Sequence, residues 1–310
     1  MNHPKKILII KTGFSEFLDR GLSTTVSLGD VLICTSLLHL YKKDEVLWLT
    51  DTKAKGLLQN NPLIRELLLF GSSSLNRIAR ESFDVLINLE KDMGLCILVN
   101  QIQAQKKYGF YYDERLHTIA TRKRSTTYLL AGQETHKGIH KNALEILYET
   151  VGEQWNGESL VLKSTSGKKP IFDIGFNYDV GPKWPTKAWP LEHWKELDKI
   201  LGNTYKISWQ QGHKNLSKYI AWINSCRLLV TSDSLGQAIG QALGKKVITL
   251  YGPTNYLRMH NVPGVHVIAS TLKCPCMPCY LPVCQFDKFC MDYISPEKVA
   301  MTCEEILQKG

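Results

Sequence analysis

The chain has 310 residues, of which 44% are hydrophobic and 22% are charged, and this ordinary globular composition excludes a disordered chain. Its length favours two domains rather than one. No apolar run approaches the ~20 residues that span a bilayer, and the N-terminal apolar run is too short for a secretory signal, so we expect a cytoplasmic protein.

The formal net charge of +9 favours an anionic partner. Basic residues gather between Gln105 and Lys141, and they are Lys106, Lys107, Arg115, Arg122, Lys123, Arg124, Lys137 and Lys141. A field of this kind attracts phosphate groups, nucleic acid or an anionic membrane face. A solvated loop surface is an equally good explanation of the same residues.

Short apolar runs alternate along the chain with helical stretches, which is typical of βαβ units and a parallel sheet. In chain order, the first half predicts a strand at 6–11, a helix from 28, strands at 46–50, 64–70 and 83–89, and helices near 94–103 and 143–151. A polar linker at 163–170 precedes a strand at 171–177, a helix at 191–201, strands at 227–231 and 246–251, and a helix between those two strands. We therefore predict an α/β fold with two Rossmann-like domains, 1–165 and 166–310, that face a central cleft.

A short polar motif, Ser27-Leu28-Gly29-Asp30, follows the first predicted strand. Ligands of an α/β sheet bind at the carboxyl ends of its strands, so a carboxylate at this place faces the ligand. Gly29 lets a bulky substrate approach the backbone, and Asp30 can take a proton from an acceptor hydroxyl as a general base. Alternatively, Asp30 is only the N-cap residue of the following helix.

A second motif, KWPTKAWP at 183–190, follows the first strand of the second half. A hydroxyl and a lysine just before a helix N-terminus suit a phosphate group, because free backbone N–H groups and the helix dipole point to the same place. Thr186 would supply a hydrogen bond, Lys187 a positive charge, and the two tryptophans would wall the site. The alternative is a surface loop that buried tryptophans anchor.

A third motif, TSDSLG at 231–236, also lies at a strand end and begins a helix. The backbone N–H groups of Ser234, Leu235 and Gly236 are suited to hold a pyrophosphate. Asp233 either caps the helix or orients the donor molecule.

The segment YGPT at 251–254 follows the next predicted strand. Its place at a strand end suits Gly252 and Thr254 to contact a ribose or a base. Each of these segments is a weak signal alone, but their shared position at successive strand ends is a stronger one.

A cysteine-rich segment at 274–290 contains Cys276, Cys279, Cys284 and Cys290, with Cys274 as an extra thiol. Four thiolates at this spacing can close a tetrahedral zinc or iron site. With four protein ligands, such a metal would be structural. The alternatives are reduced packing cysteines or a disulfide.

The motifs, in this order, resemble glycosyltransferase family 9, the ADP-heptose:lipopolysaccharide heptosyltransferases. The matching stretches are KKILIIK, SLGDVLICTSLLHL, NPLIRELLLF, KWPTKAWPLEHWKEL, LLVTSDSLGQAIGQALGKKVITLYGPTN and CMPCYLPVCQFDKFCMDYISPEKV. The resemblance implies a GT-B fold with metal-independent catalysis, in which the first domain holds the acceptor and the second holds the nucleotide-sugar. It also implies that Asp30 is the catalytic base, that Thr186 and Lys187 bind the donor phosphates, and that Asp233 begins the donor-binding turn.

The chain departs from the family pattern in three places. A loop at 12–26 separates the first strand from the SLGD motif, and the turn Leu235-Gly236-Gln237-Ala238 replaces the usual Gly-Pro-Met-His. The cysteine segment resembles the iron-binding segment of autotransporter heptosyltransferases, which act on protein. These departures leave the acceptor and the donor sugar open.

These observations predict an inverting transfer of a heptose from ADP-heptose to a lipopolysaccharide-core or other anionic glycan, with peripheral contact at the inner membrane. The alternatives are a non-catalytic nucleotide-sugar-binding relative and a protein heptosyltransferase. A metal- or nucleic-acid-binding protein would not explain why phosphate-suited segments recur at strand ends, so we expect no nucleic-acid partner.

Overall fold

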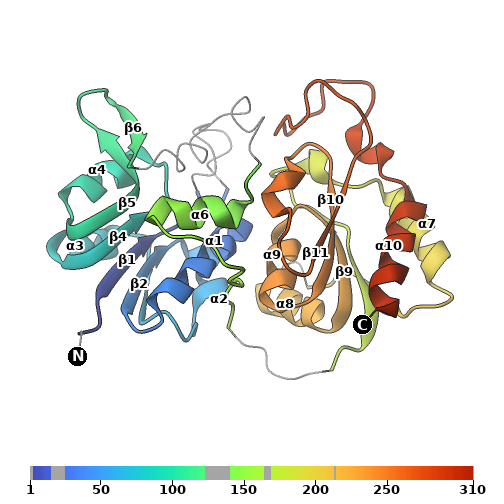
Figure 1. Ribbon diagram of the computed structural model, residues 1–310, viewed down its shortest axis with the longest axis horizontal. Coiled ribbons are helices and arrows are strands. Elements are labelled where there is room, and N and C mark those ends of the chain that lie inside the picture. The colour runs from blue at the N-terminus through green and yellow to red at the C-terminus, as the bar shows by residue number, and fades with distance from the viewer. Residues whose placement is uncertain (1–2, 15–24, 123–139, 164–168, 213, 310) are drawn as a thin grey trace. The chain divides into compact units, whose positions relative to one another are not determined.

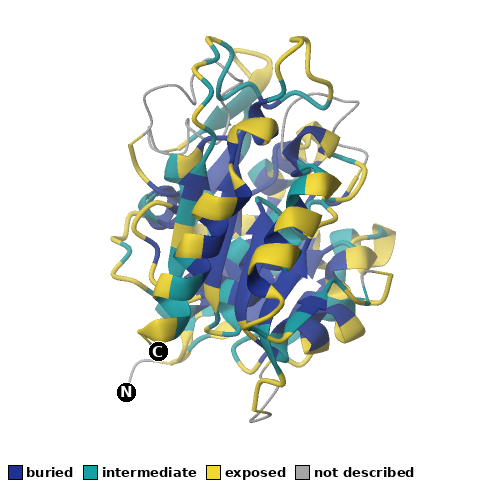
Figure 2. Cartoon of the chain, turned by 90° about the vertical axis from the view of Figure 1, so that its right-hand side faces the viewer, coloured by how far each residue is buried: buried dark blue, intermediate teal, exposed yellow. Residues whose placement is uncertain are grey.

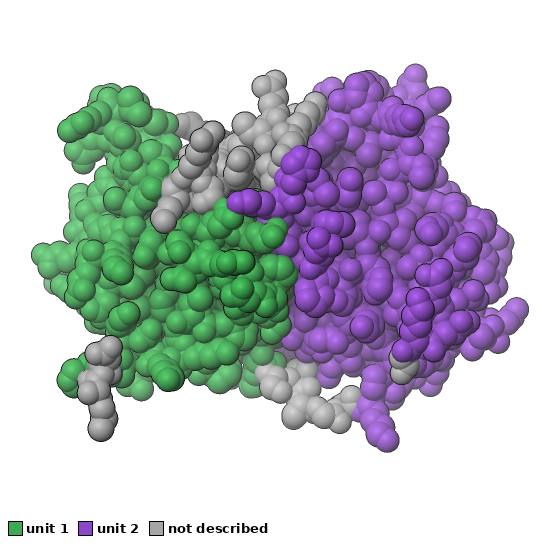
Figure 3. Space-filling view, in the orientation of Figure 1, with its two compact units in different colours: residues 1–135, 143–163 green, residues 136–142, 164–310 purple. Residues whose placement is uncertain are grey.

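The computed structural model describes residues 3–14, 25–122, 140–163, 169–212 and 214–309. The chain divides into two compact units, unit 1 with Met1–Thr135 and Ala143–Lys163, and unit 2 with His136–Asn142 and Ser164–Gly310 (Figure 3). Most of the loop at 12–26, most of the linker, and Lys123, Arg124 and Lys137 lie outside the described residues.

Unit 1 contains a six-stranded sheet with the order β3-β2-β1-β4-β5-β6 (Figure 1). Its strands are β1 (Lys6–Ile10), β2 (Glu45–Thr50), β3 (Glu66–Leu69), β4 (Ser82–Asn88), β5 (Gln103–Asp113) and β6 (Thr118–Thr121). Neighbouring strands run parallel, except for the antiparallel pair β5 and β6. The helical segments are α1 (Leu28–Cys34), η2 (Thr35–Tyr41), η3 (Thr52–Ala54), α2 (Lys55–Leu58), α3 (Ser72–Arg80), α4 (Met93–Gln101) and α6 (Ala143–Val151).

The central strand of unit 1, β1, consists almost entirely of apolar residues. Ile7, Leu8, Ile9 and Ile10 are fully buried, because β2 and β4 flank the strand in the sheet and helical segments cover both faces. The apolar run ends at Ile10, and the next residue is Lys11. This end of the sheet carries the polar groups of the candidate site.

Unit 2 contains a five-stranded parallel sheet with the order β11-β10-β9-β7-β8. Its strands are β7 (Phe172–Asn177), β8 (Ile207–Trp209), β9 (Cys226–Ser232), β10 (Lys246–Tyr251) and β11 (Val265–Ala269). The helical segments are η5 (Pro185–Lys187), α7 (Leu191–Leu201), α8 (Leu216–Asn224), α9 (Leu235–Ala242), η6 (Tyr256–Met259), η7 (Cys290–Tyr293) and α10 (Pro296–Gln308). α7 packs against α10 on one side of the sheet and α8 against α9 on the other, so that exposed helix faces cover buried strands (Figures 1 and 2).

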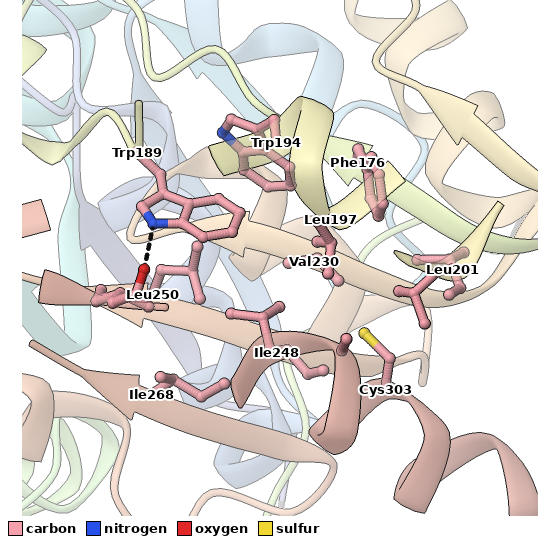
Figure 4. Packing of buried hydrophobic residues seen from close by; sticks show 14 of the residues in the cluster. Phe176, Trp189, Trp194, Leu197, Leu201, Val230, Ile248, Leu250, Ile268 and Cys303 are labelled. Carbon is pink, nitrogen blue, oxygen red and sulfur yellow. Dashed lines mark hydrogen bonds between the residues drawn. The ribbon is translucent and has the colours of Figure 1, made fainter. Parts of the chain in front are cut away.

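The core on the α7 side of unit 2 is aromatic (Figure 4). The ring centroids of Trp189 and Trp194 lie 5.0 Å apart, and those of Phe176 and Trp194 lie 5.4 Å apart. The indole N–H of Trp189 donates a hydrogen bond to the carbonyl oxygen of Ile294 at 3.0 Å. Trp189 is 2% exposed, so it belongs to this core and does not wall a ligand site as the sequence had suggested.

The two-sheet α/β fold class predicted from the sequence is confirmed. In the described part of the chain, no helix combines the length and the apolar character that crossing a membrane requires.

Candidate functional site

A buried ion pair lies at the carboxyl ends of β1 and β4 in unit 1. The Nζ atom of Lys11 lies 3.4 Å from Oε1 of Glu90, and the two side chains are 7% and 0% exposed. The same carboxylate oxygen accepts the backbone N–H groups of Thr12 at 2.6 Å and Gly13 at 2.7 Å. The two strands pair in parallel, so both partners arrive at the same edge of the sheet.

The positive charge of Lys11 also interacts electrostatically with Asp30. Burial alone would lower the pKa of Lys11, but attraction to the carboxylates of Glu90 and Asp30 raises that pKa above its ordinary value. Lys11 therefore carries a full positive charge beside the candidate base at neutral pH.

Asp30 occupies the first turn of α1 and is half-buried, directly after Gly29. Its alternative role as N-cap residue is wrong, because the helix begins at Leu28 and Ser27 is the N-cap. The Ser27 N–H donates to the carbonyl oxygen of Gly13 at 2.7 Å, which ties the start of α1 to the end of β1.

Sequence reasoning missed Lys11 and Glu90. The signal was present in the sequence. Lys11 directly follows a run of aliphatic residues, and Glu90 comes just after another apolar strand, and charged residues are unusual at such places in a parallel sheet. Charges at such places are retained only when they are paired.

In unit 2, the structure brings together two residues that the sequence had placed in separate motifs. The Nζ atom of Lys187 lies 2.8 Å from Oδ2 of Asp233, and the side chains are 11% and 19% exposed. Lys187 ends the 3-10 helix η5, which Pro185 begins, and its ammonium lies 5.7 Å from the centre of the Trp184 ring. Asp233 directly follows β9.

The positive charge of a second residue, Arg258, also acts on Asp233. Burial alone would raise the pKa of the Asp233 carboxyl, but attraction to Lys187 and Arg258 holds that pKa below its ordinary value. Arg258 lies in η6, just after the segment 251–254, and no sequence motif pointed to it. The two cations that act on Asp233 are of the kind that binds a diphosphate.

Two expected roles differ in the structure. The Thr186 hydroxyl donates to the carbonyl oxygen of Leu281 at 2.5 Å and is buried, so it is not presented to a phosphate. Asp233 does not cap α9, because the helix begins at Leu235 and Ser234 is its N-cap residue. Asp233 instead holds Lys187.

A polar network supports the start of α9. The Asn177 amide donates to Thr231 Oγ1 at 2.8 Å and to Ser234 Oγ at 3.2 Å, and the Tyr219 hydroxyl donates to Asn177 Oδ1 at 2.6 Å. Gly236 is buried against this network, because a Cβ atom there would lie 2.5 Å from Asn177 Nδ2. The network therefore fixes the half-buried Ser234 and Leu235 at the helix N-terminus.

The cysteine-rich segment is attached to the turn after β10. The carbonyl oxygen of Pro253 accepts the N–H groups of Cys279 at 2.9 Å and Tyr280 at 3.0 Å. A Cβ atom on Gly252 would lie 2.7 Å from the sulfur of Cys290, so this glycine permits close packing against the segment.

The structure does not support the expected four-thiolate metal site. Cys276 forms a disulfide with Cys274, which removes one of the proposed ligands, whereas Cys279, Cys284 and Cys290 are free. Within the described ranges, no group of three or more His, Cys, Asp or Glu side chains is arranged to hold a metal ion.

Residues 211–290 match the family model "Glycosyltransferase family 9 (heptosyltransferase)". This segment contains Asp233, the start of α9, Arg258 and the cysteine-rich stretch. A comparison with curated protein sequences gives no match.

Solved structures similar to the chain include three bacterial transferases. A glycosyl transferase family 9 protein from Veillonella parvula has a TM-score of 0.73 at 20% identity, with 100% of this chain and 99% of that chain covered. The ADP-heptose lps heptosyltransferase II of E. coli has a TM-score of 0.66 at 15% identity, with 98% and 99% covered. The iron-containing dodecameric glycosyltransferase TibC of enterotoxigenic E. coli has a TM-score of 0.60 at 11% identity, with 99% and 76% covered.

At these identities the structural likeness shows the fold, and the family match identifies the segment. The resemblance inferred from the sequence motifs is therefore confirmed: residues 211–290 are a glycosyltransferase family 9 segment, and the chain has the fold of heptosyltransferases.

Proposed function

We propose that the chain is an inverting glycosyltransferase that moves a heptose from ADP-heptose to an anionic glycan acceptor. The family match and the fold support glycosyltransferase activity. The observation that carries the proposal for the donor is the cluster of Lys187, Asp233 and Arg258 at the strand ends of unit 2.

The donor half of the proposal rests on charge. The diphosphate of a nucleotide-sugar carries two negative charges, and the positive charges of Lys187 and Arg258 both act at Asp233. The N-terminus of α9 adds backbone N–H groups and its helix dipole. These groups would stabilise the negative charge that grows on the diphosphate as it leaves, and electrostatic stabilisation of this kind usually dominates such catalysis.

The acceptor half of the proposal rests on Asp30. Its carboxylate takes the proton of an acceptor hydroxyl, the hydroxyl oxygen bonds to the anomeric carbon, and the bond from that carbon to the diphosphate breaks with release of ADP. The positive charge of Lys11 interacts electrostatically with this carboxylate.

The acceptor is proposed to be anionic, in the class of a lipopolysaccharide core. One of the similar structures is a lipopolysaccharide heptosyltransferase. On the hairpin of β5 and β6, Lys106, Arg115 and Arg122 are exposed, as is Leu116 at 70%. Arg115 directly precedes Leu116 at the tip of the hairpin, and a basic side chain beside an exposed aliphatic one suits an anionic glycolipid at the inner membrane face. Charge reversal of Arg115 and Arg122 should reduce sedimentation with anionic liposomes, and unchanged sedimentation would remove this part of the proposal.

A turnover experiment tests the proposal as a whole. Purified full-length chain is incubated with ADP-heptose and a deacylated lipopolysaccharide core, and ADP release is followed with and without the acceptor. We expect ADP release that depends on the acceptor. Donor binding without any turnover would favour the non-catalytic relative, for which the altered turn at 235–238 is the supporting feature.

A further inference from the structure

We propose that Glu90 and Lys11 are positioning residues for Asp30: Glu90 fixes the backbone to which α1 is attached, and Lys11 holds a positive charge against the Asp30 carboxylate. The inference rests on the proposed function, because it gives Asp30 the role of base. It assigns a role to a buried ion pair that the proposed function does not itself use.

An unbroken series of hydrogen bonds links Glu90 to the helix that carries Asp30. The Glu90 carboxylate accepts the N–H of Gly13 at 2.7 Å, and the Gly13 carbonyl accepts the N–H of Ser27 at 2.7 Å. The Ser27 carbonyl in turn accepts the N–H of Val31 at 3.2 Å, within the first turn of α1. Gly13 and Ser27, which are far apart in the sequence, are thus joined directly by a hydrogen bond.

Gly13 is the one residue at this point that must lack a side chain. Its φ of +91° lies in the left-handed region, and a Cβ atom would lie 2.9 Å from Cγ2 of Val31. The end of β1 therefore packs directly on the first turn of α1, and a displacement of Gly13 would be passed to that turn.

A buried ion pair is a poor device for stability alone. Removing two charges from water costs more than many such pairs return, and apolar residues of similar size often stabilise a core better. Glu90 is 0% exposed, and its two backbone partners show that this geometry is specified in detail. A role in placing and charging the neighbouring carboxylate explains why a polar pair occupies this site.

Charges of both signs lie at the ends of β1 and β4. Lys11 contributes a positive charge from the end of β1, Glu90 contributes a negative charge from the end of β4, and Lys91, the next residue, is also buried. Cys34 on α1 stays neutral at neutral pH. Burial is the main cause that raises its pKa, to about 12, and the negative charges of Asp30 and Glu90 act in the same direction. Changes to Lys11 and to Glu90 should therefore act on Asp30 with opposite signs.

The test compares pH–rate profiles of Glu90→Gln and Lys11→Met with that of the unaltered chain. Glu90→Gln keeps an oxygen that accepts both N–H groups but leaves the Lys11 charge unbalanced, so the acidic limb of kcat/KM should move to lower pH. Lys11→Met removes the cation, so the limb should move to higher pH. Each shift should be about half to one pH unit.

A second comparison tests the mechanical part of the inference. Glu90→Ala removes the acceptor of both N–H groups, so kcat should fall about 10- to 100-fold with little change in KM for the donor, because small displacements of a base are costly. Glu90→Gln should recover most of this loss. Equal loss of kcat in both variants, or none in Glu90→Ala, would overturn this part.

The matched control is the ion pair at the other end of β1. Lys6 Nζ lies 2.7 Å from Glu81 Oε2, and both side chains are more exposed than those of Lys11 and Glu90. Lys6→Met and Glu81→Gln should leave the pH profile unchanged. Calorimetric ADP binding and thermal unfolding establish that each variant is folded, and rates are expressed per folded, ADP-binding protein.

The failure of this inference is distinguishable from the failure of the proposed function. If Asp30→Asn retains turnover, the assignment of the base is wrong and the proposed function fails at that step. If Asp30→Asn abolishes turnover but Glu90→Gln and Lys11→Met shift the acidic limb in the same direction or not at all, only the positioning role is refuted.

Discussion

The ammonium of Lys187 lies 2.8 Å from the carboxylate of Asp233. Lys187 lies in the 3-10 helix η5, whereas Asp233 directly follows β9, so the pair joins two segments that are separate in the sequence. The pair gives the lysine a fixed position before any ligand binds. A fixed cation costs less ordering when a phosphate arrives, which is the advantage of a preorganised site.

Lys187→Ala should weaken ADP binding about 10- to 100-fold. The variant loses a charge-assisted contact worth about 1.5–3 kcal/mol and leaves the Asp233 carboxylate to repel the diphosphate. Isothermal titration calorimetry with ADP measures the effect. Lys195→Ala, which removes an exposed lysine paired with Glu192 on α7, is the control and should bind ADP as the unaltered chain does. Equal affinity in both variants would exclude Lys187 from the phosphate site.

Asp233 should make stability depend on pH in the acid range. Its pKa is lowered in the folded chain, so the paired carboxylate stabilises the fold above the ordinary Asp pKa of 3.8, and this contribution is lost as pH falls through the lower, folded value. Urea unfolding should therefore show a deficit in Asp233→Asn of about 1–3 kcal/mol at pH 7. The deficit should shrink at pH 3; a deficit that is constant with pH would contradict the pairing.

Gly236→Ala should disturb the start of α9. The added Cβ atom would lie 2.5 Å from Asn177 Nδ2 and 2.6 Å from the Tyr219 hydroxyl, so the polar network must shift, at a cost of about 1–3 kcal/mol. ADP affinity should fall with it. Gly71→Ala is the control, since a Cβ atom on Gly71 would meet no other atom within 4 Å. Thermal unfolding of the two variants decides: equal melting temperatures would show that α9 tolerates the side chain.

The two core tryptophans in Figure 4 should respond differently to the same change. Trp189→Phe loses the hydrogen bond to Ile294, whereas the buried indole N–H of Trp194 has no hydrogen-bond partner among the described residues. Both variants leave a similar void, so Trp189→Phe should be more destabilising by about 1 kcal/mol. Urea unfolding measures the difference, and a larger loss for Trp194→Phe would contradict the hydrogen-bond assignment.

Elements with a strong apolar pattern could be predicted from the sequence. α6, α7 and β10 have the predicted bounds, and β1 and β7 differ from them by their end residues. The prediction missed β5, because its residues QAQKKYGFYYD are mostly polar or half-buried, and only the middle of the strand has a core position. A strand near the edge of a sheet lacks the continuous apolar run on which the other predictions depended.

The candidate site was predictable by location but not by pairing. The strand-end rule placed Asp30, Lys187 and Asp233 at ligand-facing edges, yet no local pattern says that Lys187 binds Asp233 or that Thr186 donates to Leu281. These pairings depend on how loops from separate strands pack. Cysteine spacing likewise could not distinguish a metal site from the disulfide of Cys274 and Cys276.

Acceptor-dependent release of ADP from ADP-heptose by Asp30→Asn is the most direct test of the central claim. The control is Asp44→Asn, which changes a carboxylate outside the candidate site that accepts the Lys5 N–H. We predict that Asp30→Asn binds ADP normally but releases none from the donor, while Asp44→Asn turns over as the unaltered chain does. Undiminished turnover by Asp30→Asn would contradict the account.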